Sequence, residues 1–386
     1  MNGFYIAPTP QLYFGPGSID HLSSVTSKWG NKILLITGKN SFANAPWKEK
    51  VNTLLQDKEV VHITHSGEPT VEQINELLCH LRNQTFDCIV SIGGGSIIDT
   101  GKTLSAMLTV SDPIEYYLEG LPDYRPHPGS KIPFIAVPTT AGTGSEATKN
   151  AVISKYGTNG YKRSIRHNNF IPDVAIIDPE LQITCSLQTT ATSGMDALTQ
   201  LIESYFSTQA NQFTDILAEK GIELAAQSLL KAYAEPACIE YRSKMAMAAY
   251  LSGITLAHAG LGAVHGFASS IGGMYNVAHG AICGCLLTQT TRINLLKMIA
   301  LSRYHDKIYK VARLLQPENL VKNINEAADF IVNTLQRWRK QLNIPSLNSL
   351  GIKQEDFDQI ANQTQIKNNP VPLDIDELKK ILAESW

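Results

Sequence analysis

The sequence contains no apolar stretch long enough to cross a membrane and no cluster of lysine or arginine. A membrane-spanning helix needs about 18 to 20 consecutive apolar residues, and no such window occurs among the 386 residues. The 33 Lys and Arg residues nearly balance the 35 Asp and Glu residues, so the net charge is −2. Proteins that bind nucleic acid or anionic membranes usually concentrate positive charge. We therefore expect neither a nucleic-acid nor a membrane partner.

Cysteine is also scarce, and its placement excludes a disulfide framework. None of the six cysteines belongs to a CxxC pair, and they are few for a chain of this length. Residues 1–17 lack the basic region, apolar core and small-residue cleavage site of a signal peptide. We therefore expect reduced thiols and a cytoplasmic protein.

The composition that is present, 43% apolar and 18% charged, is typical of a globular protein. In the first half, β-branched runs alternate with helical patterns. Residues 71–83 carry apolar side chains at three- and four-residue spacing, which indicates an amphipathic helix. The expected strands are residues 32–37, 59–63, 87–92, 131–138 and 173–178. This alternation predicts an α/β fold with a parallel sheet.

After about residue 184, the strand patterns nearly vanish and helical patterns follow one another. Residues 324–342 place apolar side chains at alternating four- and three-residue spacing, which forms one apolar stripe along a helix. We therefore predict two domains, an α/β domain of residues 1–183 and an all-α domain of residues 184–386.

Three consecutive glycines, Gly93 to Gly95, directly follow the expected strand 87–92. Glycine lets the backbone approach a ligand closely, and a helix expected to begin at Ser96, with its hydroxyl as the cap, directs free N–H groups at a phosphate. The loop does not match GxGxxG, because Ile98 stands at the third glycine position, and Ser96 replaces a glycine of Walker A. The alternative is a tight turn without a ligand.

A second polar loop, residues 138–146, follows the expected strand 131–138. It contains four hydroxyl side chains and two glycines, which can surround phosphate and ribose without adding charge. Because parallel strands end at one edge of the sheet, the two loops together indicate one ligand site. Taken alone, this loop has the alternative of a turn with local hydrogen bonds.

The second half contains a carboxylate and two histidines that can share a metal ion. Asp196 and Gln200 lie four residues apart in an expected helix, so their side chains leave the same face. His265 and His279 stand 14 residues apart. A carboxylate and two imidazoles can bind Fe²⁺ or Zn²⁺ and leave positions open for substrate. From spacing alone, the alternative is that both histidines are ordinary core or surface residues whose ring nitrogens make other hydrogen bonds.

Two neighbouring features complete this pattern. Gly272 and Gly273 are expected to break the helix between the two histidines. His258 precedes His265 by seven residues, which places both on one helix face about two turns apart. We expect His258 to line the pocket or to support the fold.

These motifs give the chain a resemblance to the iron-containing (group III) alcohol dehydrogenase family over essentially its whole length. The resemblance implies an N-terminal, Rossmann-like dinucleotide-binding domain and a C-terminal helical metal and substrate domain, with the active site between them. It also implies NAD or NADP, a divalent metal, a homodimer, and interconversion of alcohols with aldehydes or ketones. The motifs that carry it are residues 14–18, 93–102, 138–146, 194–199 and 260–266, followed by Asn369-Pro370.

Carried over by position, the resemblance makes Asp196, Gln200, His265 and His279 the metal ligands. The chain departs from the family at Gln200 and Ser269, where most members carry histidine. An amide oxygen is usually a weaker ligand than imidazole, so we expect the site to hold Fe²⁺ or Zn²⁺ loosely, with another ion or no metal as the alternatives. His258 is the nearest candidate to replace the missing proton relay. The expected catalytic residues are therefore His258, His265 and His279.

The resemblance also supplies a cofactor-binding set. NAD-preferring members often carry an aspartate at the end of the first long strand, where this chain has Gly38 followed by Lys39, Asn40 and Ser41. A cation and a hydroxyl in place of a carboxylate favour the 2′-phosphate of NADP, with NAD as the alternative. The expected cofactor-binding residues are Gly38, Gly94, Gly95, Ser96, Asp99, Thr139, Thr140, Asn150 and Lys162.

We hypothesise that the ion stabilises alkoxide-like charge on a small alcohol or aldehyde while hydride passes between the substrate carbon and the nicotinamide. One alternative is a zinc enzyme of the dehydroquinate-synthase or glycerol-dehydrogenase type. Another is a cofactor-binding protein without redox catalysis, suggested by Gln200 and Ser269. The sequence does not name the substrate, and Phe267, Tyr275 and Cys283 are candidate wall residues of the pocket.

Overall fold

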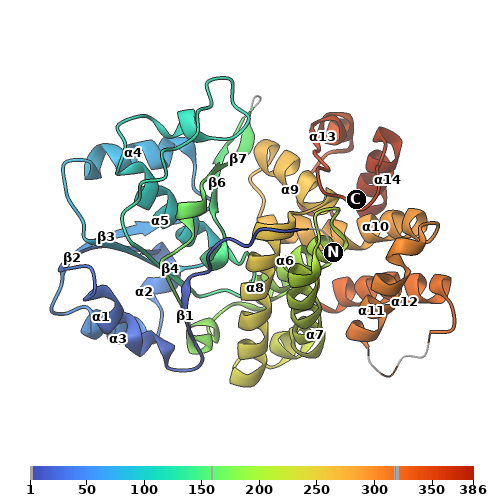
Figure 1. Cartoon of the computed structure of the whole chain (residues 1–386), viewed down its shortest axis with the longest axis horizontal. Coiled ribbons are helices and arrows are strands. Elements are labelled where there is room, and N and C mark those ends of the chain that lie inside the picture. Colours follow the sequence, from blue (N-terminus) through green and yellow to red (C-terminus); the bar gives the residue numbers. More distant parts are fainter. Residues whose placement is uncertain (1–2, 158–159, 317, 319–320) are drawn as a thin grey trace. The chain divides into compact units, whose positions relative to one another are not determined.

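The chain folds into an α/β unit and a helical unit (Figure 1). The computed structural model describes residues 3–157, 160–316, 318 and 321–386. The α/β unit comprises residues 7–140 and 144–185. The helical unit comprises residues 186–386 with residues 141–143 and the N-terminal residues up to Ile6.

Six parallel strands form the centre of the α/β unit. Their residues in the middle of the sheet are fully buried, as is usual for a parallel sheet that is covered on both faces. From edge to edge, the strands are β1 (Gln11–Phe14), β8 (Val174–Ile177), β5 (Phe134–Pro138), β4 (Cys88–Gly93), β2 (Lys32–Gly38) and β3 (Glu59–His65).

Helices cover the two faces of this sheet. Because side chains alternate along a strand, Leu34 and Ile36 pack with α4 and α5, whereas Ile33 and Leu35 pack with α1 and α3 on the other face (Figure 1). The helices of this unit are α1 (Leu22–Thr26), α2 (Lys39–Ala43), α3 (Lys48–Leu54), α4 (Val71–Leu81) and α5 (Gly95–Met107).

The five expected strands and the helix expected at residues 71–83 are confirmed, with ends that differ by one to three residues. The sequence patterns did not predict β1 or the antiparallel hairpin of β6 (Asn150–Lys155) and β7 (Tyr161–Arg166). Strand β1 has only four residues and none of them is β-branched, the apolar run of β6 is three residues long, and β7 carries charged and polar residues between its apolar ones.

The helical unit buries its apolar residues among nine helices in the described part of the chain. Helices α6, α7 and α8 pack against one another. Helix α10 packs against α6, α9, α12 and α14, and α13 packs against α9 and α14. The expected helix at 324–342 is confirmed. The helices are α6 (Leu187–Phe206), α7 (Gln212–Ala234), α8 (Ile239–Ala259), α9 (Ala263–Met274), α10 (His279–Met298), α11 (His305–Leu315), α12 (Ile324–Gln341), α13 (Phe357–Gln363) and α14 (Ile375–Ser385).

The helix break expected between His265 and His279 is confirmed, because α9 ends at Met274, directly after Gly272 and Gly273, and α10 begins at His279. One expectation about the histidine region is wrong. His258 and His265 do not share a helix. Gly260 adopts a positive φ of 69° and ends α8, and α9 then turns by 95°.

No single helix among the described residues is long and apolar enough to cross a membrane. Helices α8 and α9 together reach that length and composition, but they are bent by 95°. Most residues of both helices are buried within the helical unit. The core of a folded unit therefore accounts for their apolar character.

Candidate active site

Asp196 lies in the middle of α6, a helix that begins where the Ser186 hydroxyl accepts a hydrogen bond from the Thr189 amide. Its side chain is fully buried, and Oδ1 accepts no hydrogen bond of good geometry from the described residues. Oδ1 lies 3.3 Å from Nε2 of His265 and 3.7 Å from Nε2 of His279. A buried carboxylate oxygen that faces two imidazole nitrogens is arranged to bind a cation.

Cys283 is the fourth side chain at this point. It follows His279, the first residue of α10, by one helical turn, so the two side chains share a face. Its Sγ lies 3.7 Å from Nε2 of His279 and 3.8 Å from Nε2 of His265. One ligand atom from each of Asp196, His265, His279 and Cys283 lies within 4.8 Å of the others. We name these four residues the cation cluster.

The geometry of the cation cluster fits a divalent ion. Bonds of about 2.0 to 2.3 Å in a tetrahedral site separate neighbouring ligand atoms by about 3.3 to 3.6 Å. The separations in the cluster, 3.3, 3.7, 3.7 and 3.8 Å, lie close to that range. The residues present therefore suit an ion, and they include three of the four expected ligands.

Glu203 orients His265 from behind. Oε2 of Glu203 lies 2.6 Å from Nδ1 of His265, so Nδ1 carries a proton and donates a hydrogen bond to the carboxylate. This tautomer leaves Nε2 directed at the cation cluster. Glu203 follows Asp196 by seven residues, two turns along α6, and this spacing is the only sequence signal that could have revealed it.

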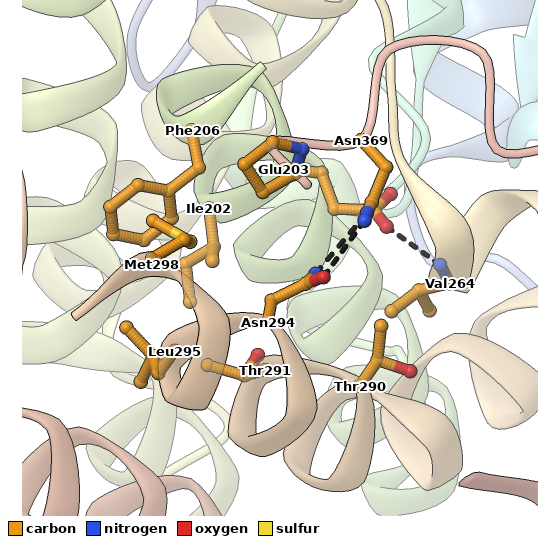
Figure 2. A pocket seen from close by; sticks show the side chains of 11 residues that line it. Ile202, Glu203, Phe206, Val264, Thr290, Thr291, Asn294, Leu295, Met298 and Asn369 are labelled. Atoms are coloured by element: carbon orange, nitrogen blue, oxygen red, sulfur yellow. Dashed lines mark hydrogen bonds between the residues drawn. The ribbon is translucent and has the colours of Figure 1, made fainter. Parts of the chain in front are cut away.

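The start of α9 is held by side chains from distant parts of the sequence (Figure 2). The Val264 amide donates to Glu203 over 2.7 Å, and the Ala263 amide donates to the Asn369 side chain over 3.2 Å. Asn294 exchanges two further hydrogen bonds with Asn369. These contacts satisfy the free amides of the first turn and thereby fix the position of His265.

Burial and mutual contacts shift the pKa values of the cluster. Burial alone would raise the pKa of Asp196, but the adjacent His279 and His265 outweigh it and lower the pKa. Burial alone would lower the pKa of His265, but contacts with Cys283, Asp196 and Glu203 hold it well above its usual range. Burial raises the pKa of the Cys283 thiol to about 12. A cation that binds here must displace protons from the cluster.

The cation cluster does not include Gln200, Ser269 or His258, whose hydrogen bonds go to other groups. Oε1 of Gln200 accepts a hydrogen bond from the Ser252 hydroxyl over 2.8 Å in the interior. Ser269 is exposed and donates to the carbonyl of His265. Nδ1 of His258 lies 2.7 Å from the Ile254 carbonyl of its own helix. The structure therefore does not place His258 among the four converging side chains.

The three residues expected to line the pocket wall, Phe267, Tyr275 and Cys283, make different contacts. Phe267 is fully buried in the core of the helical unit. The Tyr275 hydroxyl donates to the carboxylate of Asp356. Cys283 belongs to the cation cluster, and its four-residue distance from His279 is the sequence signal for that position.

In the α/β unit, the two expected cofactor loops are neighbours at one edge of the sheet. Gly93 at the end of β4 pairs in register with Pro138 at the end of β5. A Cβ atom added at Gly94 would lie 3.4 Å from the side chain of Thr140 in the second loop. Strand pairing and loop packing thus bring together the residues that we expect to surround a dinucleotide.

The helix that follows the three glycines begins at Gly95, one residue earlier than expected. Gly94 is its N-cap and provides no side-chain hydrogen bond, so the expected cap by the Ser96 hydroxyl is wrong. A helix whose first turn is capped by no side chain keeps its amides available for an anionic group. A side chain at Gly101 would collide with Ser91 on β4, so this glycine lets α5 pack closely on the sheet.

A buried lysine joins the two loops to the hairpin. Nζ of Lys102 donates to the Ser145, Thr148 and Asn150 carbonyls over 2.7, 2.9 and 2.8 Å. Burial lowers the pKa of Lys102 to about 8, so the ammonium is still the major form at neutral pH. Asp99, which is partly buried, accepts hydrogen bonds from the Ser145 hydroxyl and the Val152 amide.

The remaining expected cofactor residues lie at strand ends or on the hairpin. Thr139 follows β5, and its amide donates to the Gly93 carbonyl. Lys162 on β7 forms a partly buried ion pair with Glu68. Gly38 ends β2, and the exposed residues Lys39, Asn40 and Ser41 follow in α2. A side chain at Gly38 would collide with the Ser41 hydroxyl.

Comparison with known proteins identifies the family. Residues 8–179 match the family described as iron-containing alcohol dehydrogenase, and residues 190–386 match its C-terminal part. The chain belongs to the iron-containing alcohol dehydrogenase family. Alcohol dehydrogenase 4 of Saccharomyces cerevisiae is 30% identical, with 100% of this chain and 99% of that protein covered. The NADPH-dependent butanol dehydrogenase of Clostridium saccharobutylicum is 31% identical over 96% of this chain and 95% of its own length.

A solved structure shows the same fold. A 1,3-propanediol oxidoreductase matches with a TM-score of 0.89 and 30% identity over 100% of both chains. The resemblance found in the sequence and the expected fold class, an α/β domain followed by a helical domain, are confirmed. As an iron-containing-type alcohol dehydrogenase, the chain interconverts alcohols and aldehydes with a nicotinamide dinucleotide and a metal.

Proposed function

We propose that Asp196, His265 and His279 hold the divalent ion of this dehydrogenase and that its substrates are small primary alcohols and their aldehydes. The observation that carries the proposal is the convergence of two imidazole nitrogens on Oδ1 of buried Asp196. The names of the relatives, a butanol dehydrogenase and a 1,3-propanediol oxidoreductase, support the substrate class. The expected fourth ligand, Gln200, lies one turn after Asp196 on α6.

When bound, the ion supplies Lewis acidity for developing charge on an alcohol oxygen, and the nicotinamide supplies hydride exchange. The protein provides the orientation. Glu203 keeps the proton of His265 on Nδ1, so Nε2 is free to act as a ligand. Asn369 and Glu203 fix the first turn of α9, which limits the movement of His265. His258 stays our candidate for proton transfer, although the Ile254 carbonyl already engages its Nδ1.

We also propose that the activity depends on the bound ion. Metal-stripped protein should reduce butanal with NADPH at least about a hundredfold more slowly, because a Lewis acid contributes several kcal/mol to stabilising transition-state charge. Added Fe²⁺ or Zn²⁺ should restore the rate. The measurement is the decrease of NADPH absorbance, with metal content determined on the same sample. An undiminished rate in verified metal-free protein would contradict the proposed ion site.

For the cofactor, we propose NADP bound at the edge formed by β2, β4 and β5. The first turn of α5, with Gly94, Gly95 and Ser96, would hold the pyrophosphate, and Thr139 and Thr140 the adjoining groups. Lys39, Asn40 and Ser41, which follow Gly38, would bind the 2′-phosphate. The exposure of these three side chains and the absence of an acidic residue at Gly38 support this preference. The butanol dehydrogenase relative is named as NADPH-dependent.

The variant Lys39→Ala tests this preference. We expect its KM for NADPH to rise about tenfold or more, because a charge-assisted hydrogen bond to phosphate contributes about 1.5 to 3 kcal/mol. Its KM for NADH should change less than twofold. Lys28→Ala is the matched control, since Lys28 is also exposed but precedes β2 rather than following it. Equal changes for the two cofactors would contradict the assignment.

We propose residues 1–183 as the dinucleotide domain and 184–386 as the metal and substrate domain, with Asp99, Asn150 and Lys162 completing the cofactor set. Asp99 and Asn150 would act by holding the loop that Lys102 also contacts, since Asn150 accepts from Lys102 and Asp99 accepts from Ser145.

A homodimer in the cytoplasm also stays a proposal. The six free cysteines support a reducing compartment, and light scattering of the purified protein measures the assembly.

A further inference from the structure

Cys283 is the member of the cation cluster that the family pattern does not assign to the metal. Its side chain is fully buried. Its Sγ faces Nε2 of both His279 and His265 at 3.7 and 3.8 Å. A carboxylate oxygen of Asp196 belongs to the same group of atoms within 4.8 Å. The sulfur therefore points to the position on which the three proposed ligands converge.

The side chain of Gln200, unlike that of Cys283, has a hydrogen-bond partner outside the cation cluster. Its amide oxygen accepts a hydrogen bond from the buried Ser252 hydroxyl over 2.8 Å. The Ser252 oxygen also lies 2.7 Å from the Ala249 carbonyl of its own helix, α8. An amide oxygen with this partner would have to share its lone pairs with an ion, whereas the thiol faces two other ligands directly.

The charge of the four direct ligands suits a dication. Asp196 as a carboxylate and Cys283 as a thiolate together balance it, and the two imidazoles are neutral. The buried Glu203 carboxylate behind His265 adds a further negative charge beside the site.

We propose that Cys283 binds the ion as its fourth ligand, in place of Gln200, and that this donor set selects Zn²⁺ over Fe²⁺. The proposal rests on the proposed function for the other three ligands. Thiolate is a soft ligand that favours zinc, and mixed cysteine and histidine sites for zinc are common. As the S–metal bond forms, the thiol proton leaves to the solvent, and no electron is transferred.

Cobalt absorption spectroscopy tests the assignment on the full chain. Metal-stripped wild-type protein with Co²⁺ should show a sulfur-to-cobalt charge-transfer band in the near ultraviolet. Cys283→Ser should lose this band, and its Zn²⁺ affinity should fall at least about a hundredfold, because even a residue that merely orients a ligand contributes 10- to 100-fold. Its preference for Zn²⁺ over Fe²⁺ should also decrease. Cys285→Ser, two residues along α10, should retain both band and affinity.

Two further measurements make the result independent of misfolding. X-ray absorption at the zinc edge of the unmodified protein should show one sulfur at about 2.3 Å. The double variant Cys283→Ser, Gln200→His should recover Zn²⁺ affinity without the band. Only nitrogen and oxygen around zinc, or an unchanged band in Cys283→Ser, would overturn the role of Cys283 alone. Failure of wild-type protein to bind Co²⁺ and Zn²⁺ would overturn the three-ligand proposal as well.

Discussion

Replacing Asp196 by alanine should lower kcat/KM for aldehyde reduction about a thousandfold or more while leaving NADPH binding nearly intact. The variant removes the buried carboxylate on which His265 and His279 converge. Loss of the ion would remove electrostatic stabilisation worth several kcal/mol in the transition state. The cofactor loops belong to the α/β unit, so the affinity for NADPH should change less than twofold.

Steady-state kinetics, metal analysis and titration of NADPH fluorescence together check this expectation. Asp215→Ala is a matched control, because Asp215 is a partly buried carboxylate of the helical unit that pairs with Lys307 and lies outside the cation cluster. We expect the control to retain most of its activity and its metal. Full activity in Asp196→Ala would refute the role of this residue in metal-dependent catalysis.

Replacing Lys102 by methionine should lower the free energy of unfolding by about 3 to 5 kcal/mol, the usual cost of removing one partner from a buried charged network. The ammonium donates to three backbone carbonyls in the segment from Ser145 to Asn150. Without it, those carbonyls lose their donor and Asp99 loses the nearest positive charge. Urea denaturation followed by circular dichroism gives the change.

An exposed lysine provides the comparison for this variant. Lys220→Met removes a surface ion pair with Glu223 and should change the unfolding free energy by less than about 1 kcal/mol. The double variant Asp99→Asn, Lys102→Met should recover part of the loss, because no unpaired buried carboxylate is left. Similar stabilities for Lys102→Met and Lys220→Met would show that the buried network contributes little.

The alternation of strands and helices was predictable because the central strands are buried on both faces and therefore read as continuous apolar runs. Edge strand β1 and the hairpin of β6 and β7 are only partly buried. Their mixed sequences resemble loops, so local pattern could not reveal them. The break after the glycines at 272 and 273 was predictable, because glycine has low helix propensity, and α9 ends at Met274.

The convergence of Asp196, His265 and His279 was predictable from their residue types and from the family motifs. Glu203 and Cys283 were not assigned to the cation cluster or its support, because a single glutamate or cysteine at helical spacing is common in any helix. Their importance depends on how α6, α9 and α10 pack. Likewise, the dipeptide Asn369-Pro370 did not disclose that Asn369 anchors the first turn of α9.

That anchor has a consequence for the order in which the protein matures during synthesis. Asn369 follows Asp196, His265 and His279 in the sequence, so these three residues emerge from the ribosome before the residue that fixes α9. The start of α9 gains this anchor only after translation has passed Asn369. A prematurely terminated chain that ends before Asn369 would present the same cation-binding side chains without the scaffold that orients them.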